Sequence, residues 1–296
     1  MRVFSPAGAY IASHPLAFVR QVLKGFKTNQ GLLLAGAVAY YALLSVVPLL
    51  ILVVIGLSHF IPQTELLATL QRYLEWVVPG QSRAIIAELR NFVEHRDVIG
   101  PLLGITMLFF SSLAFTVLEK AMTVIFLHRL AVRHRRFVVS ALLPYAYILS
   151  LGLGFLIVTL VAGMLEAIGQ DSVRLFGTEW SLQGFSGVLL YLLGFVGEVF
   201  VLSSVYMVMP VGRLVWRHAL IGGATAAVLW EITRHLLVWY FSTLSQVSVV
   251  YGSLTTAIVV LFSMEIGATL LLLGAQVISE YERVGKKAAE AASVAA

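Results

Sequence analysis

A chain of 296 residues, of which 59% are hydrophobic and 12% charged, is not an ordinary soluble domain, where about a quarter would be charged. Its net charge is +5, and its lack of cysteine excludes disulfides and cysteine-ligated zinc or iron–sulfur centres. This composition predicts an all-α fold, a polytopic membrane helix bundle.

The N-terminal segment, residues 1–30, is mixed and basic rather than continuously apolar. We expect it to remain uncleaved in the cytoplasm, with the first apolar segment acting as a signal-anchor. Within it, His14–Asn29 places Phe18, Val22 and Phe26 at four-residue intervals among basic side chains. That spacing is typical of an amphipathic helix that lies on the membrane surface.

Six later segments reach the length of about 20 apolar residues that a transmembrane helix needs. In chain order they are Gly31–Leu57, Val98–Thr116, Phe137–Met164, Leu182–Pro210, Ala219–Phe241 and Tyr251–Ile278. We expect six transmembrane helices that form one membrane domain, residues 31–278, followed by a cytoplasmic tail, residues 279–296.

The distribution of Lys and Arg predicts the orientation. Most of them lie in the N-terminal segment, the second and fourth connections and the tail: Arg2, Arg20, Lys24, Lys27, Arg129, Arg133, Arg135, Arg136, Arg213, Arg217, Arg283, Lys286 and Lys287. The opposite side carries Arg72, Arg83, Arg90, Arg96 and Arg174. The positive-inside rule therefore places both termini in the cytoplasm, where the basic side chains also contact anionic lipid headgroups.

The first external connection, residues 58–97, predicts a helical hairpin of two short amphipathic helices separated by Pro79–Gly80. Two interpretations stay open. The helices either pack on the bundle, or they form a lid or a docking surface for an envelope protein.

The first predicted span contains an internal proline. Pro48 removes one helix hydrogen bond, which the Ser45 hydroxyl or a water molecule partly restores, and this predicts a kink or a cavity. We therefore place Tyr41, Ser45 and Pro48 among the candidate cavity residues.

Three glutamates, Glu198, Glu231 and Glu265, each lie near the middle of a long apolar segment. A carboxylate at bilayer depth costs about 2–4 kcal/mol on insertion scales. Three such residues indicate that the bundle encloses a polar cavity between the first, fourth, fifth and sixth spans.

Each acid has different neighbours. Glu231 precedes Arg234 by three residues, which predicts an ion pair within one helix. Glu198 shares a helix face with Tyr191 and two glycines, Gly187 and Gly194.

Glu265 shares a helix face with Gln276 and has no cation near it in its own helix. It is therefore either a proton site or a partner of Arg234 on the neighbouring helix. Gln276 and Tyr191 complete the set of candidate cavity residues. The glycines of spans four and six are compatible with a homo-oligomer and equally with packing inside one chain.

Segments spread over the whole membrane region resemble the YihY/BrkB family of bacterial inner-membrane proteins. The resemblance rests on Ala37–Leu50, Tyr206–Pro210, Arg213, Trp216–Arg217, Gly222–Ala224, Glu231, Tyr240, Tyr251–Leu254 and Leu273–Gln276. Its motif residues here are Tyr40, Tyr41, Pro48, Tyr206, Pro210, Glu231, Tyr251, Gly252 and Gly274. Two positions differ: Ser263–Glu265 replaces the common Trp-x-Tyr, and Gln276 replaces a common glutamate.

The resemblance implies a multi-pass protein of the bacterial inner membrane and a link to virulence or serum resistance. Members have also carried a ribonuclease BN label, which the residues do not support. The seven histidines show no metal-ligand spacing, and the sequence has no phosphate-binding loop. We expect no enzyme activity, cofactor, metal or nucleic-acid partner.

Our leading hypothesis is a transporter-like protein that handles lipid or another amphipathic envelope component through the intramembrane cavity. In this hypothesis Arg234 contacts an anionic headgroup, and Glu198 and Glu265 line the path. Two alternatives are a non-transporting platform that docks an envelope partner through residues 58–97 and an ion-coupled carrier of a small solute.

Overall fold

The computed structural model describes residues 6–57, 62–77, 80–94, 101–126, 146, 150, 153, 173–175, 178–180, 182–210, 214–243 and 255–294. The third predicted span, Phe137–Met164, lies outside the described residues except at isolated positions, and so do the motif residues Tyr251 and Gly252.

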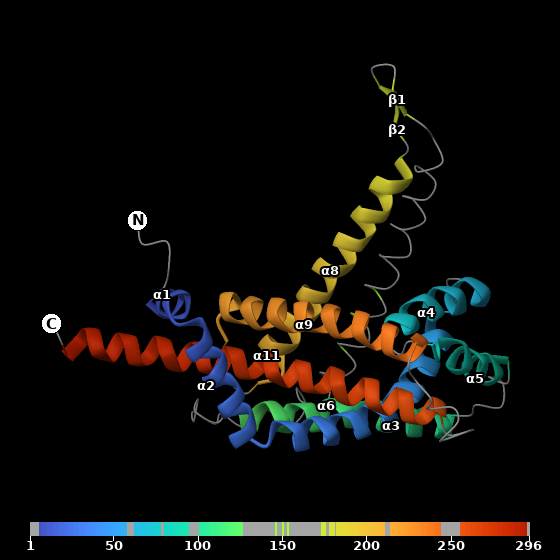
Figure 1. Ribbon diagram of the computed structural model, residues 1–296. Coiled ribbons are helices and arrows are strands. Elements are labelled where there is room, and N and C mark those ends of the chain that lie inside the picture. Colours follow the sequence, from blue (N-terminus) through green and yellow to red (C-terminus); the bar gives the residue numbers. More distant parts are fainter. Residues whose placement is uncertain are drawn as a thin grey trace.

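The described part of the chain is predominantly helical, which confirms the predicted class (Figure 1). Its helices are α1 (Pro6–Ser13), α2 (Pro15–Thr28), α3 (Gly31–Leu57), α4 (Gln63–Val77), α5 (Ser82–Glu94), α6 (Pro101–Ile125), α8 (Leu182–Val208), α9 (Trp216–Thr243) and α11 (Thr255–Val294).

A short antiparallel hairpin, β1 (Val173–Leu175) and β2 (Thr178–Trp180), precedes α8 and was not predicted. The register places Arg174 opposite Glu179.

Three described helices are long and apolar enough to cross a membrane: Gly31–Leu57, Tyr191–Val208 and Ala257–Lys287. The first coincides with the first predicted span. The count of six spans is not confirmed. The helix α9 occupies the fifth predicted span, but Glu231, Arg234 and His235 lie in its middle and make it less apolar than α3.

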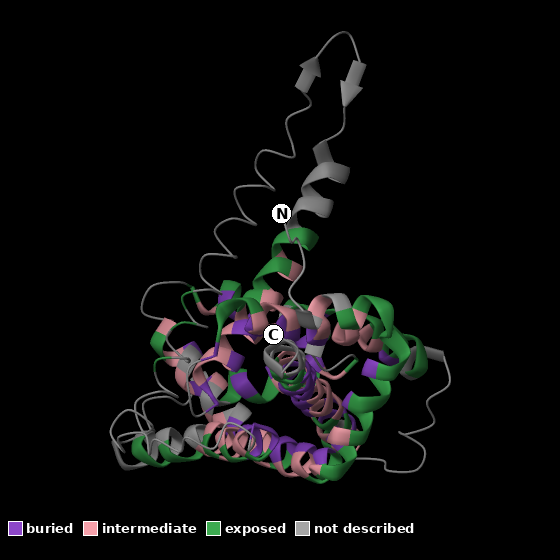
Figure 2. Ribbon diagram, turned by 90° about the vertical axis from the view of Figure 1, so that its left-hand side faces the viewer, coloured by how far each residue is buried: buried purple, intermediate pink, exposed green. Residues whose placement is uncertain are grey.

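The last helix, α11, lies at the centre of the bundle. It packs against α2, α3, α6 and α9, and its buried face is visible when the bundle is seen along its length (Figure 2). Leu272, Ala275 and Ile278 are fully buried there. The predicted span ended at Ile278, whereas the helix continues to Val294 because the tail is rich in alanine, lysine and glutamate, which favour helix.

Close approach of α9 and α11 requires glycine on both helices. A Cβ atom on Gly274 would lie 3.0 Å from the Gly222 carbonyl oxygen and equally close to the Ala226 Cβ. At the same crossing, the buried Tyr206 hydroxyl donates a 2.7 Å hydrogen bond to the Leu271 carbonyl of α11. The motif residues Tyr206 and Gly274 therefore hold α8, α9 and α11 together.

The N-terminal amphipathic helix is confirmed as α2, which lies across one end of the bundle (Figure 1). Phe18, Val22 and Phe26 are buried, and this face packs on α11 rather than on lipid. A neighbouring stripe, which includes Leu16 and Val19, is exposed. The stripe is therefore the part of α2 that suits contact with the membrane surface.

The two predicted amphipathic helices of residues 58–97 are confirmed as α4 and α5, with Gly80 at a positive φ of 76° in the break between them. Their external location stays a prediction. Leu74 and Leu89 are buried against Ile51 and Val54 of α3. The packing interpretation is therefore confirmed, and docking of an envelope protein stays a prediction.

The two termini lie at the end of the bundle opposite α4 and α5 (Figure 1). The chain has no native cysteine, so a single cysteine introduced at the exposed positions Ala87 or Glu290 is the one thiol that can be labelled. Its labelling therefore shows on which side of the membrane that position lies. We predict that an impermeant maleimide labels Ala87→Cys in spheroplasts with intact membranes, and Glu290→Cys only after the membrane is permeabilised. The reverse pattern would contradict the predicted orientation.

Candidate functional site

A cavity of about 410 Å³ lies among α3, α6, α8, α9 and α11. These include the helices of the first, fourth, fifth and sixth predicted spans. The lining residues are Val38, Ala42, Ala114, Phe115, Leu118, Glu198, Leu202, Ala226, Trp230, Ser263, Met264, Gly267, Ala268, Leu270 and Leu271. We refer to this space as the central cavity.

The walls of the central cavity are mainly apolar, so the predicted polar character is limited to a few groups. Its hydrogen-bonding side chains are those of Glu198, Ser263 and Trp230, whose indole N–H is a donor. Ser263 is only 1% exposed, and its Oγ has no hydrogen-bond partner among the described residues. A hydroxyl buried without a partner costs about 1–3 kcal/mol. In the sequence, Ser263 is notable only as a departure from a family pattern, because nothing in its own helix shows which neighbours surround it.

Glu198 lies beside an ion pair that the sequence predicted. Arg234 binds Glu231 through two hydrogen bonds, Nη2 to Oε1 at 2.6 Å and Nε to Oε2 at 3.1 Å. The Tyr191 hydroxyl of α8 donates a further bond of 2.5 Å to Glu231 Oε1. Glu198 experiences the charges of both Glu231 and Arg234, but it forms no salt bridge within the described part of the chain.

The Glu231–Arg234 pair does not line the central cavity. Arg234 forms a bidentate ion pair with Glu231 of its own helix, and Tyr191 of α8 binds the same carboxylate. Arg234 therefore has a packing role between α8 and α9. The expectation that Arg234 contacts an anionic headgroup thereby loses its main support.

Glu265 also lies outside the cavity lining, and its side chain is exposed. Its Oε1 atom is 3.9 Å from the place where a Cβ atom on Gly36 would be, so it faces the first span. Arg234 forms its salt bridge with Glu231, and the described residues show none between Arg234 and Glu265. The structure therefore brings one of the three acids into the cavity.

Ser45 connects α3 to α6 by hydrogen bonds and does not replace the helix hydrogen bond that Pro48 removes. Its Oγ is 2.7 Å from the carbonyl oxygens of both Tyr41 and Phe110, and it accepts a 3.1 Å hydrogen bond from the Ala114 amide. The bond that Pro48 removes belongs to the Leu44 carbonyl, four residues earlier. Ser45 does not restore that bond, because its hydroxyl is inserted between Phe110 and Ala114 of α6.

The other side chains of the first-span motif lie at its surface. Tyr41 is half-buried and Tyr40 is exposed, with their rings packed edge to face at a centroid distance of 5.2 Å. Pro48 lies inside α3. None of these three residues is in the lining of the central cavity.

Gln276 joins α2 to α11 at the end of the bundle that contains the termini. It is fully buried, accepts a 2.9 Å hydrogen bond from Asn29 Nδ2 and donates one of 3.1 Å to Glu280 Oε1. Arg283 donates to the same oxygen at 3.2 Å. Gln276 therefore secures α2 and lies away from the central cavity.

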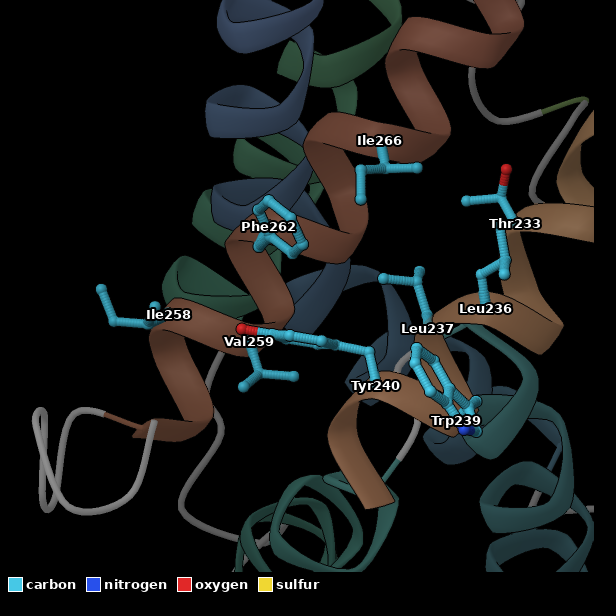
Figure 3. Close-up of a pocket in the computed structure, with 9 residues that line it drawn as sticks. All are labelled: Thr233, Leu236, Leu237, Trp239, Tyr240, Ile258, Val259, Phe262 and Ile266. Atoms are coloured by element: carbon cyan, nitrogen blue, oxygen red, sulfur yellow. The ribbon is translucent and has the colours of Figure 1, made fainter. Parts of the chain in front are cut away.

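A second space, which we call the aromatic groove, opens between the C-terminal half of α9 and the start of α11 (Figure 3). Its volume is about 430 Å³, and it is lined by Thr233, Leu236, Leu237, Trp239, Tyr240, Ile258, Val259, Phe262 and Ile266. Figure 3 shows the Tyr240 ring extending from α9 towards Val259 of α11. This groove was not predicted, although Trp239 and Tyr240, two adjacent aromatic residues near a span end, are a visible signal in the sequence.

The aromatic groove adjoins the central cavity along both helices. On α9, Thr233 of the groove follows Trp230 of the cavity by three residues, which is one helical turn. On α11, Phe262 and Ser263 are consecutive, one on each side. Neighbouring turns of α9 and α11 therefore line the two spaces.

These features define a helical membrane protein with an apolar cavity inside its bundle. The family described as "Virulence factor BrkB" matches residues 22–296, and the chain belongs to this family.

Curated relatives are named as membrane proteins. A UPF0761 membrane protein of Chlorobium phaeobacteroides is 29% identical over 259 residues, which cover 86% of this chain and 54% of that protein. One from Alkalilimnicola ehrlichii is 28% identical over 266 residues, covering 88% and 57%, and one from Vibrio campbellii is 25% identical over 265 residues, covering 88% and 81%. The chain spans little more than half the length of the first two. No solved structure matches.

The ion pair predicts a non-additive effect on stability. Arg234→Ala leaves the Glu231 carboxylate without its cation in a low-dielectric environment, and we expect it to lower the free energy of unfolding by about 3 kcal/mol. The double variant Glu231→Leu/Arg234→Leu removes both charges and should lie closer to the wild type. Thermal unfolding in detergent measures both, and a double variant at least as unstable as the single one would contradict this account.

Proposed function

We propose that the protein is transporter-like and handles lipid or another amphipathic component of the cell envelope, whose apolar part occupies the central cavity. The observation that carries this proposal is the composition of the cavity: mainly apolar walls from five helices, with Glu198, the unpartnered Ser263 hydroxyl and the Trp230 indole N–H as the polar groups.

The volume and the lining favour an amphipathic ligand over a small polar solute. A space of about 410 Å³ is within the usual range of ligand pockets, which combine apolar walls with a few placed polar groups. A hydrated ion or a sugar would need more hydrogen-bonding partners than Glu198, Ser263 and the Trp230 indole supply. An acyl or other hydrocarbon segment needs none along its length, and a polar group on the ligand satisfies the Ser263 hydroxyl.

The aromatic groove supplies access from the bilayer. Its walls are apolar, and the exposed Trp239 and Tyr240 belong to the residue types that concentrate at membrane–water interfaces. We infer that a hydrocarbon chain enters the groove from the lipid and passes between α9 and α11 to the central cavity.

We also propose where the protein is located and that it catalyses no reaction. The charge distribution and the bacterial relatives support the inner membrane, with both termini in the cytoplasm. We expect no covalent chemistry, and in particular no cleavage of RNA.

Filling the cavity tests this proposal. Ala42 lines the cavity, whereas Ala224 is exposed on α9 and outside the lining, so Ala42→Phe and Ala224→Phe add the same side chain to the cavity and to a control site. Native mass spectrometry of the protein released from nanodiscs should show a lipid class retained above its bulk abundance in the wild type and in Ala224→Phe. Ala42→Phe should lose most of it.

Ser263→Ala provides the second test, because it removes the polar contact with little change in volume. We expect weaker retention of the same lipid class. Retention equal to bulk abundance in the wild type would contradict the proposal and favour the docking platform.

A further inference from the structure

The external hairpin contains a polar hollow that is separate from the two intramembrane spaces. It has a volume of about 710 Å³ and lies between α4 and the start of α5. It is lined by Ala68, Gln71, Arg72, Glu75, Gly80, Ser82 and Arg83. We call it the hairpin hollow.

Two arginines, one from each helix, supply its charge. Arg72 of α4 and Arg83 of α5 both line the hollow, and neither forms a salt bridge or a hydrogen bond with any described residue. Gln71 adds an amide from α4. The hollow therefore presents two guanidinium groups whose donors are not used by the described part of the protein.

The single carboxylate in the lining is already engaged. Glu75 Oε1 accepts a 2.6 Å hydrogen bond from the Gly80 amide, and its Oε2 accepts one of 2.5 Å from the Ser82 hydroxyl. Both acceptor oxygens thus hold the turn that starts α5. Two arginines against one glutamate leave a net positive charge in the lining. The groups that remain available for a ligand are the two guanidinium groups and the Gln71 amide.

The position of the hollow brings it to the membrane surface. Leu67 and Leu74 of α4 pack against Ile51 and Val54, near the end of α3 at Leu57. Because α3 is long enough to cross a membrane, its end lies at the level of the headgroups. The hairpin that rests on it therefore holds the two arginines at that level.

We propose that the hairpin hollow binds a phosphate-bearing anion through Arg72 and Arg83. One planar guanidinium group can donate two parallel hydrogen bonds to two phosphate oxygens. Two guanidinium groups, one from α4 and one from α5, therefore suit a phosphate monoester or diester. The phosphate belongs either to a phospholipid headgroup or to a free phosphate compound. This site does not depend on the proposed function of the central cavity, because no residue lines both spaces.

The test uses the full chain in phosphatidylcholine nanodiscs with two probes. Phosphatidylglycerol, added as a minor lipid, is followed by native mass spectrometry, and inorganic phosphate and glycerol phosphate are followed by titration calorimetry. Arg72→Gln and Arg83→Gln should each weaken binding about tenfold, the loss of one charge-assisted contact. Arg90→Gln removes the same charge from the exposed surface of α5 outside the lining and should bind as the wild type does.

The outcomes distinguish a phospholipid headgroup from a free phosphate compound as the source of the phosphate. Retention of phosphatidylglycerol without binding of the soluble probes assigns the site to a lipid headgroup, and binding of the soluble probes assigns it to a free phosphate compound. Two results overturn the proposal: neither probe binds the wild type, or Arg90→Gln loses as much binding as the variants of the hollow. Unchanged melting temperatures of all variants exclude unfolding as the cause of a loss.

Discussion

The fold depends on one constraint: the hydrocarbon core of a bilayer offers no hydrogen-bond partner, so every polar group inside it needs one from the protein. Ser45 meets this constraint by inserting its hydroxyl between Phe110 and Ala114 of α6. Glu231 meets it with Arg234 and Tyr191. Ser203 and Ser263 do not meet it within the described residues, although both side chains are buried. Of these two, Ser263 lies in the wall of the central cavity, and it is the reason for assigning a ligand there.

The central place of α11 follows from the same constraint, because membrane helices associate through close packing and polar contacts rather than through exclusion of water. Gly222 and Gly274 allow α9 and α11 to approach, and Tyr206 adds a hydrogen bond across the crossing. Towards the termini, Gln276 fixes α2 to the same helix. At the other end of the described α9–α11 pair, large side chains such as Trp239 and Phe262 line the aromatic groove instead. The two helices are thus held tightly in one region and are separated by a groove in another.

Sequence patterns predicted the features that are contained within a single helix. The bounds of α3, the apolar face of α2 and the Glu231–Arg234 pair all follow from spacing along the chain, whereas the packing of that face on α11 does not. Contacts between helices were not predictable in this way. Glu198 and Glu265 look alike in the sequence, but only Glu198 lines the central cavity, since that depends on how α8 and α11 are rotated about their axes. Ser45 and Gln276 were predicted to line a cavity. In the structure they instead form hydrogen bonds between helices, Ser45 with Phe110 of α6 and Gln276 with Asn29 at the end of α2.

Photo-crosslinking with a phospholipid that carries a diazirine on its acyl chain tests the central claim most directly. The protein is irradiated in nanodiscs, and the adducts are located by peptide mass spectrometry. Our account predicts adducts on residues of the central cavity, such as Met264 and Leu202, that decrease in Ala42→Phe. Adducts confined to exposed side chains on the outside of the bundle, such as Val196, Val228 and Ile232, would contradict it.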